Sequence, residues 1–150
     1  MNRKNILLKL MNYWPPFLGA GIRVDFMAAD YHKIIVSMKL KFWNKNYVNT
    51  HYGGSLYSMT DPFYMLMLIQ ILGRDYIIWD KSASIRFKKP GTGKVTAVFE
   101  FTAAQIEDYK HELKDKDKIE PVLMVNISDE KGEVVATVEK VLHIKKKISR

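Results

Sequence analysis

Apolar side chains recur at every second position in two segments near the start of the chain. The first segment contains Ile22, Val24, Phe26 and Ala28, and the second contains Ile34, Val36, Met38, Leu40 and Phe42. A period of two is typical of strands that bury one face. Because only a short turn over 29–32 separates them, the sequence predicts a hairpin.

The same alternation returns in the second half of the chain. It predicts one strand with Ile85 and Phe87 on one face, and another with Val95, Ala97, Phe99 and Phe101 on one face. A polar stretch over 104–118 predicts a short helix and a loop. Two last strands are predicted over 122–127 and through Val134, Ala136, Val138, Leu142 and Ile144, and Gly132 between them suits a left-handed turn position.

One segment, Gly54 to Gly73, is apolar throughout and has nearly the length of a membrane span. Asp61, Pro62 and Gln70 interrupt it, and a carboxylate inside a membrane is costly, so we expect a buried helix of a soluble protein. Alternating strands around one apolar helix predict an α+β fold with an antiparallel sheet of about five to six strands curled around one long central helix, the hotdog architecture.

The remaining organisation is simple. We expect residues 1–150 to form a single domain, in which residues 1–20 are an N-terminal helical extension that ends at Pro15 and Pro16. Lys9 interrupts the apolar part of this start, so it does not match a signal peptide. The chain has no cysteine, which excludes disulfides, cysteine-ligated zinc and thiol nucleophiles. The absence of cysteine is a hint of a cytoplasmic location.

The formal net charge is +8, and the lysines are dispersed. Dispersed lysines are typical of a solvated surface, and no nucleic-acid-binding signature accompanies them, so no nucleic-acid partner is expected. An anionic small molecule that carries phosphates suits the same charge.

The segment NYVNTHYGGSLYSMTD, from Asn46 to Asp61, resembles the signature of thioesterase-type hotdog proteins. In that signature an Asn, a His-Gly-Gly turn at the start of the central helix, and an acidic residue seven positions after the second Gly recur. The wider pattern, including DPFYMLML and an aromatic-rich start, is similar to the DUF4442 branch of acyl-CoA thioesterase-like proteins. The resemblance implies hydrolysis of a thioester, coenzyme A as part of the substrate with no separate cofactor or metal, and a homodimer or a dimer of dimers (homotetramer).

The chemistry of the motif can be argued from its residues. A helix that opens with Gly53 and Gly54 exposes backbone N–H groups to a ligand, as an oxyanion hole requires. Asp61, desolvated by aromatic neighbours, would have a raised pKa and act as general base or as nucleophile. The alternative is that Asp61 caps a helix beginning at Pro62. If Asp61 instead lies within the central helix, Pro62 kinks that helix and frees the Ser58 carbonyl.

Other candidate residues surround this pair. Aligning the glycines places Tyr52 where the family has its His, so His51 is either a catalytic histidine displaced by one position or an ordinary loop residue. Asn46 either positions the carbonyl or is a turn residue. Asp80 lies beside the attacking group or at a strand edge, with Ser82 on the same strand face and with Lys81 or Arg86 to offset its charge. Tyr52, Tyr57, Phe63 and Trp79 are candidates for an acyl pocket, and Arg86, Lys88 and Lys89 for contacts with the CoA phosphates.

We therefore predict an enzyme that hydrolyses acyl-CoA or a related thioester, with Asp61 as general base or nucleophile and Gly53 and Gly54 holding the oxyanion. The alternatives are a catalytically silent hotdog protein that binds acyl-CoA or a lipid as a sensor, and a basic interaction module. Along one helix Gly54 and Asp61 would lie about 10 Å apart, so we expect a homodimer in which the partner helix completes each site.

Overall fold

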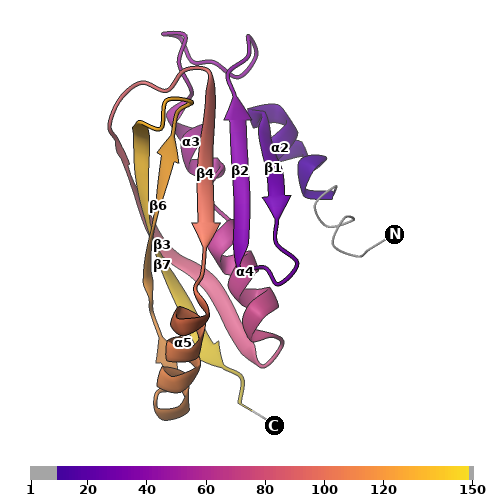
Figure 1. The fold of residues 1–150 in the computed structure, drawn as a ribbon, viewed down its shortest axis with the longest axis vertical. Coiled ribbons are helices and arrows are strands. Elements are labelled where there is room, and N and C mark those ends of the chain that lie inside the picture. Colours follow the sequence, from indigo (N-terminus) through magenta and orange to yellow (C-terminus); the bar gives the residue numbers. More distant parts are fainter. Residues whose placement is uncertain (1–9, 149–150) are drawn as a thin grey trace.

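The computed structural model describes residues 10–148, and in it one antiparallel sheet wraps around a central helical segment (Figure 1). The strands are β1 (Ile22–Met27), β2 (Lys33–Lys39), β3 (Tyr76–Phe87), β4 (Lys94–Glu100), β5 (Lys118–Ile119), β6 (Val122–Ser128) and β7 (Val134–Lys146). Their order is β1-β2-β4-β6-β7-β3, with β5 paired to β7. The predicted α+β hotdog fold and both predicted hairpins are confirmed.

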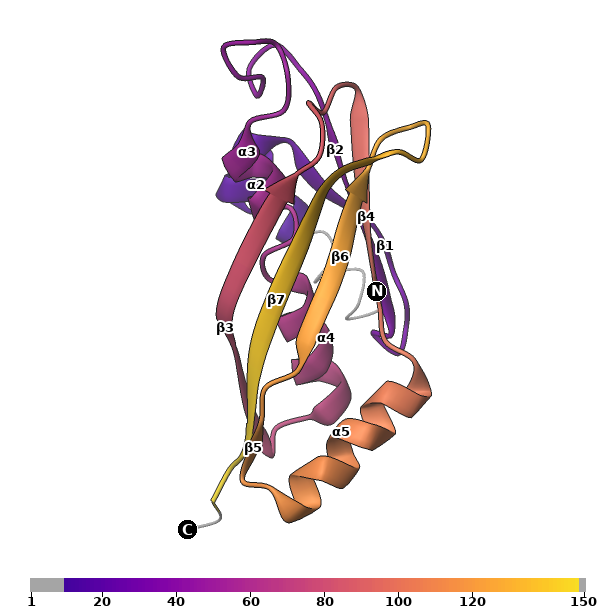
Figure 2. The same ribbon diagram turned by 90° about the vertical axis from the view of Figure 1, so that its left-hand side faces the viewer.

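The described helices are α2 (Pro15–Ala20), α3 (Gly53–Ser58), α4 (Phe63–Leu72) and α5 (Ala103–Asp115). Figure 2 shows α4 behind the strands and α5 at the lower end of the molecule. Helix α4 packs one side inside the curled sheet, where Phe63, Met67 and Leu68 are completely buried, while Ile69 on another side is 38% exposed. No helix of residues 10–148 is long and apolar enough to cross a membrane.

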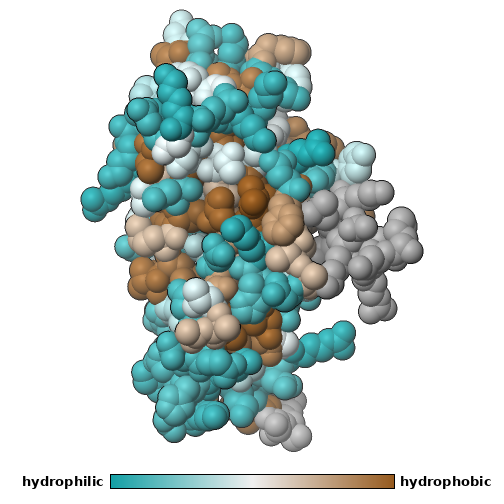
Figure 3. All heavy atoms as spheres, viewed as in Figure 1, coloured by the Kyte–Doolittle hydropathy of each residue, from teal (hydrophilic) through white to brown (hydrophobic). Residues whose placement is uncertain are grey.

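We call the sheet face that packs on α4 the inner face. It carries the buried aliphatic residues of the alternating pattern, among them Ile34, Val36, Val95, Ala97, Val138 and Leu142. The outer face is mixed: Figure 3 shows apolar side chains scattered among hydrophilic ones on the view of Figure 1. Exposed apolar residues on the outer face include Phe26, Val98 and Met124.

The predicted N-terminal helix lies mostly outside the described residues. Pro15 and Pro16 occupy the first turn of α2, where a missing N–H costs nothing. The helical turn over 10–12 ends before these prolines, which also begin a helix of their own.

The central helix is interrupted between α3 and α4, as Pro62 predicted. The amides of Met59 and Thr60 still donate to Ser55 and Tyr57, and the amide of Asp61 donates to the Ser58 carbonyl at 3.3 Å. The prediction that the Ser58 carbonyl lacks a partner is therefore wrong. The interruption places Asp61 in a turn rather than within a helix.

Two irregularities break the period of two. A bulge between Val24 and Phe26 turns Phe26 outward, where it is 46% exposed although the alternation predicted it inside. In β3 a bulge lies between Asp80, which opposes buried Leu142, and Ser82, which opposes Val141. The prediction that Asp80 and Ser82 share a face is wrong, because the extra residue places Ser82 on the outer face.

His51, in the loop before α3, is a buried polar residue that is only 3% exposed. Its Nε2–H donates to the Gly93 carbonyl at 2.9 Å, and its backbone N–H donates to the Gly91 carbonyl at 2.9 Å. Its Nδ1 is buried and has no hydrogen-bond partner among the described residues. Burial lowers the pKa of His51, and the bond to Gly93 opposes this only in part.

This lowered pKa predicts a loss of stability in acid. Below about pH 6.5 the unfolded chain takes up a proton on His51 that the folded chain resists, so the free energy of unfolding falls as the pH falls, by at most about 1.4 kcal/mol per pH unit. His51→Gln keeps an N–H donor but cannot titrate. We expect the difference in unfolding free energy between wild type and His51→Gln, measured by urea denaturation, to shrink from pH 7.5 to pH 5.5.

The exposed His111 on α5 provides the matched control. His111→Gln makes the same replacement at an exposed site, so a change that both variants share cannot be assigned to the buried histidine. A parallel pH dependence in wild type and His51→Gln would show that the buried histidine is not responsible.

Candidate functional site

A fully buried lysine lies at the centre of the candidate site. Lys140, on the inner face of β7, has no exposed side-chain surface. Its ammonium donates to the Asp61 carbonyl oxygen, to Asp61 Oδ1 at 3.3 Å and to Asp80 Oδ2 at 3.0 Å. It also lies 5.9 Å from the centre of the Tyr57 ring. The three N–H donors of an ammonium therefore match three acceptors.

Asp80 anchors this lysine from β3. Burial raises the pKa of Asp80, and the hydrogen bond and charge of Lys140 oppose that rise. The predicted proximity of Asp80 to Asp61 is consistent with both carboxylates binding one ammonium. The prediction that Lys81 offsets the charge of Asp80 is wrong, however, because Lys81 pairs with Glu120 at 2.8 Å instead.

Asp61 lies at the interruption between α3 and α4, and its side chain is 54% exposed. The Tyr57 hydroxyl, one helical turn earlier, donates to Asp61 Oδ1 at 3.2 Å. Burial, and then the charge of Asp61, raise the pKa of Tyr57 to about 12, so this phenol keeps its proton. The expected desolvation of Asp61 is wrong for this chain alone, since Phe63 and Tyr64 are buried in the core.

The alternative role of Asp61 as a helix cap is also not observed. The N-cap position of α4 is Pro62, and no side chain accepts a hydrogen bond there. The Asp61 carboxylate instead binds the side chains of Tyr57 and Lys140.

The start of α3 borders a pocket of about 430 Å³ with mixed polar and apolar walls. Neither Gly53 nor Gly54 donates its amide N–H to another group among the described residues. A Cβ at Gly53 would lie 3.0 Å from the Phe87 ring, and one at Gly54 would lie 2.6 Å from the Tyr52 ring. The pocket is lined by Asn46, Thr50, His51, Gly53, Leu56, Phe87, Lys88, Lys89, Pro90 and Gly91.

The polar residues near this pocket serve the loop before α3. Asn46 accepts from the amides of Val48 and Thr50 and donates to the Thr50 hydroxyl, so it closes a turn. His51 holds this loop against the loop between β3 and β4. These contacts match the turn and loop alternatives for Asn46 and His51, while Tyr52 stays 60% exposed at the N-cap of α3.

The three cations proposed for the CoA phosphates lie in different surroundings. Lys89 pairs with Asp129 at 2.6 Å and with Glu133. Arg86 opposes Thr137 and lines a groove on the outer face together with Ser84, Lys88 and Glu139, but it does not line the pocket at Gly53. Lys88 alone of the three lines the pocket without an ion pair among the described residues.

Two of the aromatic residues proposed for an acyl pocket lie elsewhere. Phe63 is completely buried in the core against Phe17 and Phe99. Trp79 stacks on His143 at 3.9 Å, and these two residues oppose each other in the β3–β7 ladder. Only Tyr57 and Tyr52 remain near the candidate site.

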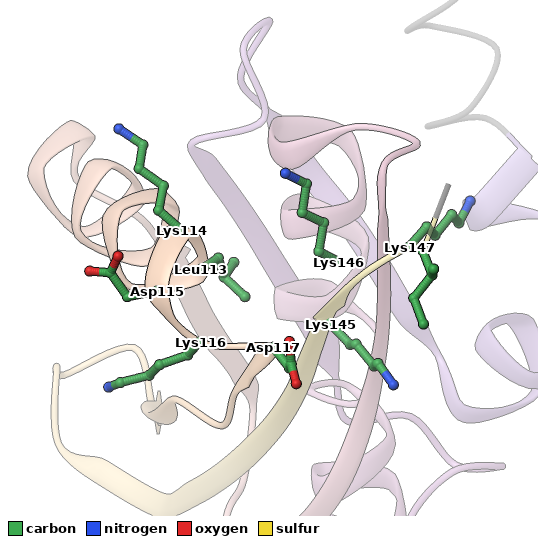
Figure 4. A pocket seen from close by; sticks show the side chains of 9 residues that line it. Leu113, Lys114, Asp115, Lys116, Asp117, Lys145, Lys146 and Lys147 are labelled. Atoms are coloured by element: carbon green, nitrogen blue, oxygen red, sulfur yellow. The ribbon is translucent and has the colours of Figure 1, made fainter. Parts of the chain in front are cut away.

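A second concavity lies between the end of α5 and the end of β7. Its cations are Lys114, Lys116, Lys145, Lys146 and Lys147. Figure 4 shows that their ammonium groups point in different directions and do not converge on one position. Asp115 and Asp117 lie among them, so the geometry does not resemble a phosphate site.

Lys140 was missed in the sequence, although the sequence contained a signal for it. The inward positions of the last strand run 134, 136, 138, 140, 142 and 144, and position 140 is the one charged residue in that series. A lysine at a position that the period of two assigns to the core requires a buried partner.

Comparisons with solved structures agree with this fold. A probable thioesterase of unknown function from Pseudomonas aeruginosa is similar, with a TM-score of 0.82 and 20% identity, over 96% of each chain. A thioesterase from Haemophilus influenzae has a TM-score of 0.68 and 13% identity, over 100% of this chain and 94% of the other. The PaaI protein of the E. coli phenylacetic acid degradation operon has a TM-score of 0.64 and 15% identity, over 98% and 94%.

No curated protein sequence matches the chain. A family model does match it, over residues 3–144, under the description of a domain of unknown function. With its hotdog fold and its likeness to probable thioesterases, the chain belongs to the DUF4442 family.

Proposed function

We propose that this protein hydrolyses an acyl-CoA or a related thioester. The observation that carries the proposal is the placement of Asp61: its carboxylate is held by Lys140 and Tyr57, yet more than half of its side chain is open to a ligand. Structural carboxylates that bind buried cations are usually covered themselves, whereas a general base must reach its substrate.

In the proposed reaction a water molecule attacks the thioester carbonyl carbon while the Asp61 carboxylate takes its proton. The amides of Gly53 and Gly54 stabilise the oxyanion. The carbon–sulfur bond then breaks, the oxyanion re-forms the carbonyl of the free acid, and the thiolate leaves with the proton from Asp61. The same placement also serves direct attack by Asp61, which forms an anhydride that water hydrolyses.

A homodimer is proposed to complete each site. Strand β3 is at the edge of the sheet, and a long unpaired edge favours pairing with a second copy. Towards its end the inner face of β3 is open, with Phe87 57% exposed beside Gly53. A partner across this edge would bring its own Gly53–Gly54 turn towards Asp61 and would cover both. Pairing of two such dimers through their outer faces remains a further proposal.

A non-catalytic acyl-CoA or lipid sensor is the second candidate. It is favoured by His51, whose Nε2–H donates to the Gly93 carbonyl and whose backbone stands one position before that of the histidine in the family signature. The two functions differ in turnover. Since the chain has no cysteine, CoA released from a panel of acyl-CoAs can be followed with a thiol reagent. Release supports the hydrolase, and saturable binding without release supports the sensor.

Asp61→Asn should reduce kcat at least about 100-fold, the usual effect of losing an acid–base group. The amide oxygen of Asn can still accept from Tyr57 and Lys140, so we expect the unfolding midpoint to change little. The exposed Asp75 provides the control, and Asp75→Asn should keep full activity. Retained activity in Asp61→Asn would remove Asp61 from the mechanism.

Lys88→Gln should raise KM for acyl-CoA and leave KM unchanged for a short thioester without the nucleotide, because Lys88 is the unpaired cation at the pocket. Arg86→Gln serves as the matched control, since Arg86 shares the outer groove with Lys88 but does not line the pocket at Gly53. Equal effects of Lys88→Gln on both substrates, or equal effects of the two variants, would contradict a phosphate contact by Lys88.

Subunit exchange tests the shared site. Asp61→Ala removes the base, and Gly54→Val places a side chain against Tyr52 where the amide should be open. Each variant alone should be inactive. A random mixture should recover about a quarter of wild-type activity, because half of the dimers are mixed and each has one intact site of two. No recovery after verified exchange would place each site within one chain.

A further inference from the structure

We infer that Lys140 is the positioning residue for Asp61, because one ammonium binds both the backbone carbonyl and the carboxylate of that residue. This inference rests on the proposed function for its kinetic consequence. Its structural part, the binding of Asp61 and Asp80 by the Lys140 ammonium, can be tested without any enzymatic activity.

The first step of the argument is the hydrogen-bond vacancy at the helix interruption. In a continuous helix the carbonyl of Asp61 would accept from the amide four residues later. In this structure α4 begins with the amide of Leu66 donating to Pro62, and no backbone amide of the described residues donates to the Asp61 carbonyl. Lys140 fills this vacancy from the opposite strand, and so fixes the backbone at the interruption.

The second step is that Lys140 binds Asp61 at two points, its backbone carbonyl and its carboxylate. A bond to the carbonyl alone would leave the Asp61 side chain free to rotate, and a bond to the carboxylate alone would leave the turn free to move. With both, and with Tyr57 on the same Oδ1, the orientation of the carboxylate is determined while Oδ2 has no hydrogen-bond partner among the described residues. The oxygen that can take a proton from water is therefore presented in a fixed direction.

The third step concerns what holds Lys140 itself. Within residues 10–148 the only other acceptor for its ammonium is Asp80 Oδ2, and Asp80 Oδ1 is buried there without a hydrogen-bond partner. A buried ammonium with two carboxylates is saturated, and losing it would leave a half-buried charge at Asp80. Asp80 thus anchors the lysine, and the lysine positions Asp61.

The absence of cysteine allows a sharp test. Lys140→Cys introduces the single thiol of the chain, which is alkylated in denaturant and refolded. Bromoethylamine gives a thioether side chain that ends in an ammonium, one sulfur atom replacing a methylene of lysine. Bromopropane gives a side chain of the same length without the charge. Circular dichroism and the unfolding midpoint establish that both products fold.

We expect the aminoethyl product to recover most of the wild-type kcat and the kcat of the propyl product to fall at least about tenfold. KM should change little, because the Asp61 carboxylate loses its orientation while substrate binding is kept. In an Asp61→Asn background the two products should have equal kcat, because the lysine acts through Asp61. A further loss in that background, or equal kcat of the two products with Asp61 present, would overturn the inference.

The structural part is measured without substrate. Carboxyl-carbon NMR should show Asp80 titrating at higher pH in the propyl product than in the aminoethyl product, because Lys140 lowers the pKa that burial raises; the groups facing Asp80 are Lys140, Asp61 and Tyr57. Identical titration would contradict the ion pair. If wild type releases no CoA from any substrate while this shift is seen, the proposed function fails and the hold on Asp61 stands.

Should neither alkylated product refold, Asp80→Asn combined with Lys140→Met removes both buried charges together. This double variant is compared with Asp80→Asn alone. A tenfold lower kcat in the double variant supports the inference, and equal kcat contradicts it.

Discussion

One buried ammonium joins three parts of this fold that are distant in the sequence. Lys140 on β7 binds Asp80 on β3 and the turn at Asp61 between the two halves of the central helix. Burying a charged lysine costs several kcal/mol unless its donors are satisfied, and here all three are. The helix can therefore be interrupted at Pro62 without losing its place against the sheet, and the interruption is what exposes a carboxylate on an otherwise apolar segment.

The balance of charge in this cluster matters as much as its geometry. Two carboxylates and one ammonium leave an excess of negative charge, and burial raises the pKa of Asp80 while Lys140 opposes that rise. Tyr57 adds a neutral donor that keeps its proton. The two carboxylates therefore differ in role. Asp80 binds Lys140 and is mostly buried, whereas Asp61 binds Lys140 and keeps an exposed side.

Much of the fold could be predicted because most strands follow a strict alternation. Val95, Ala97 and Phe99 lie inside as expected, and the polar stretch after them forms α5 behind a Thr102–Gln105 capping box. Phe26 and Ser82 were misplaced because a bulge adds one residue and leaves no mark in the hydrophobic pattern. Lys140 was overlooked because composition assigns lysine to the surface, whereas only its partners, brought together by the fold, show why it is buried. For the same reason the sequence identified Asp61 but not its surroundings.

The bulge at Lys81 has a consequence for how this strand tolerates changes in length. Because one extra residue switches the faces of β3, Asp80 points towards Lys140 and Phe87, seven positions later, points towards Gly53. Without the bulge, residues seven positions apart would lie on opposite faces of the strand. Strand β3 could then no longer place Asp80 against Lys140 and Phe87 against Gly53 at the same time. A loss of one residue between the bulge and Phe87, of the kind that most surface loops tolerate, would therefore separate Asp80 from Phe87 across the two faces of β3.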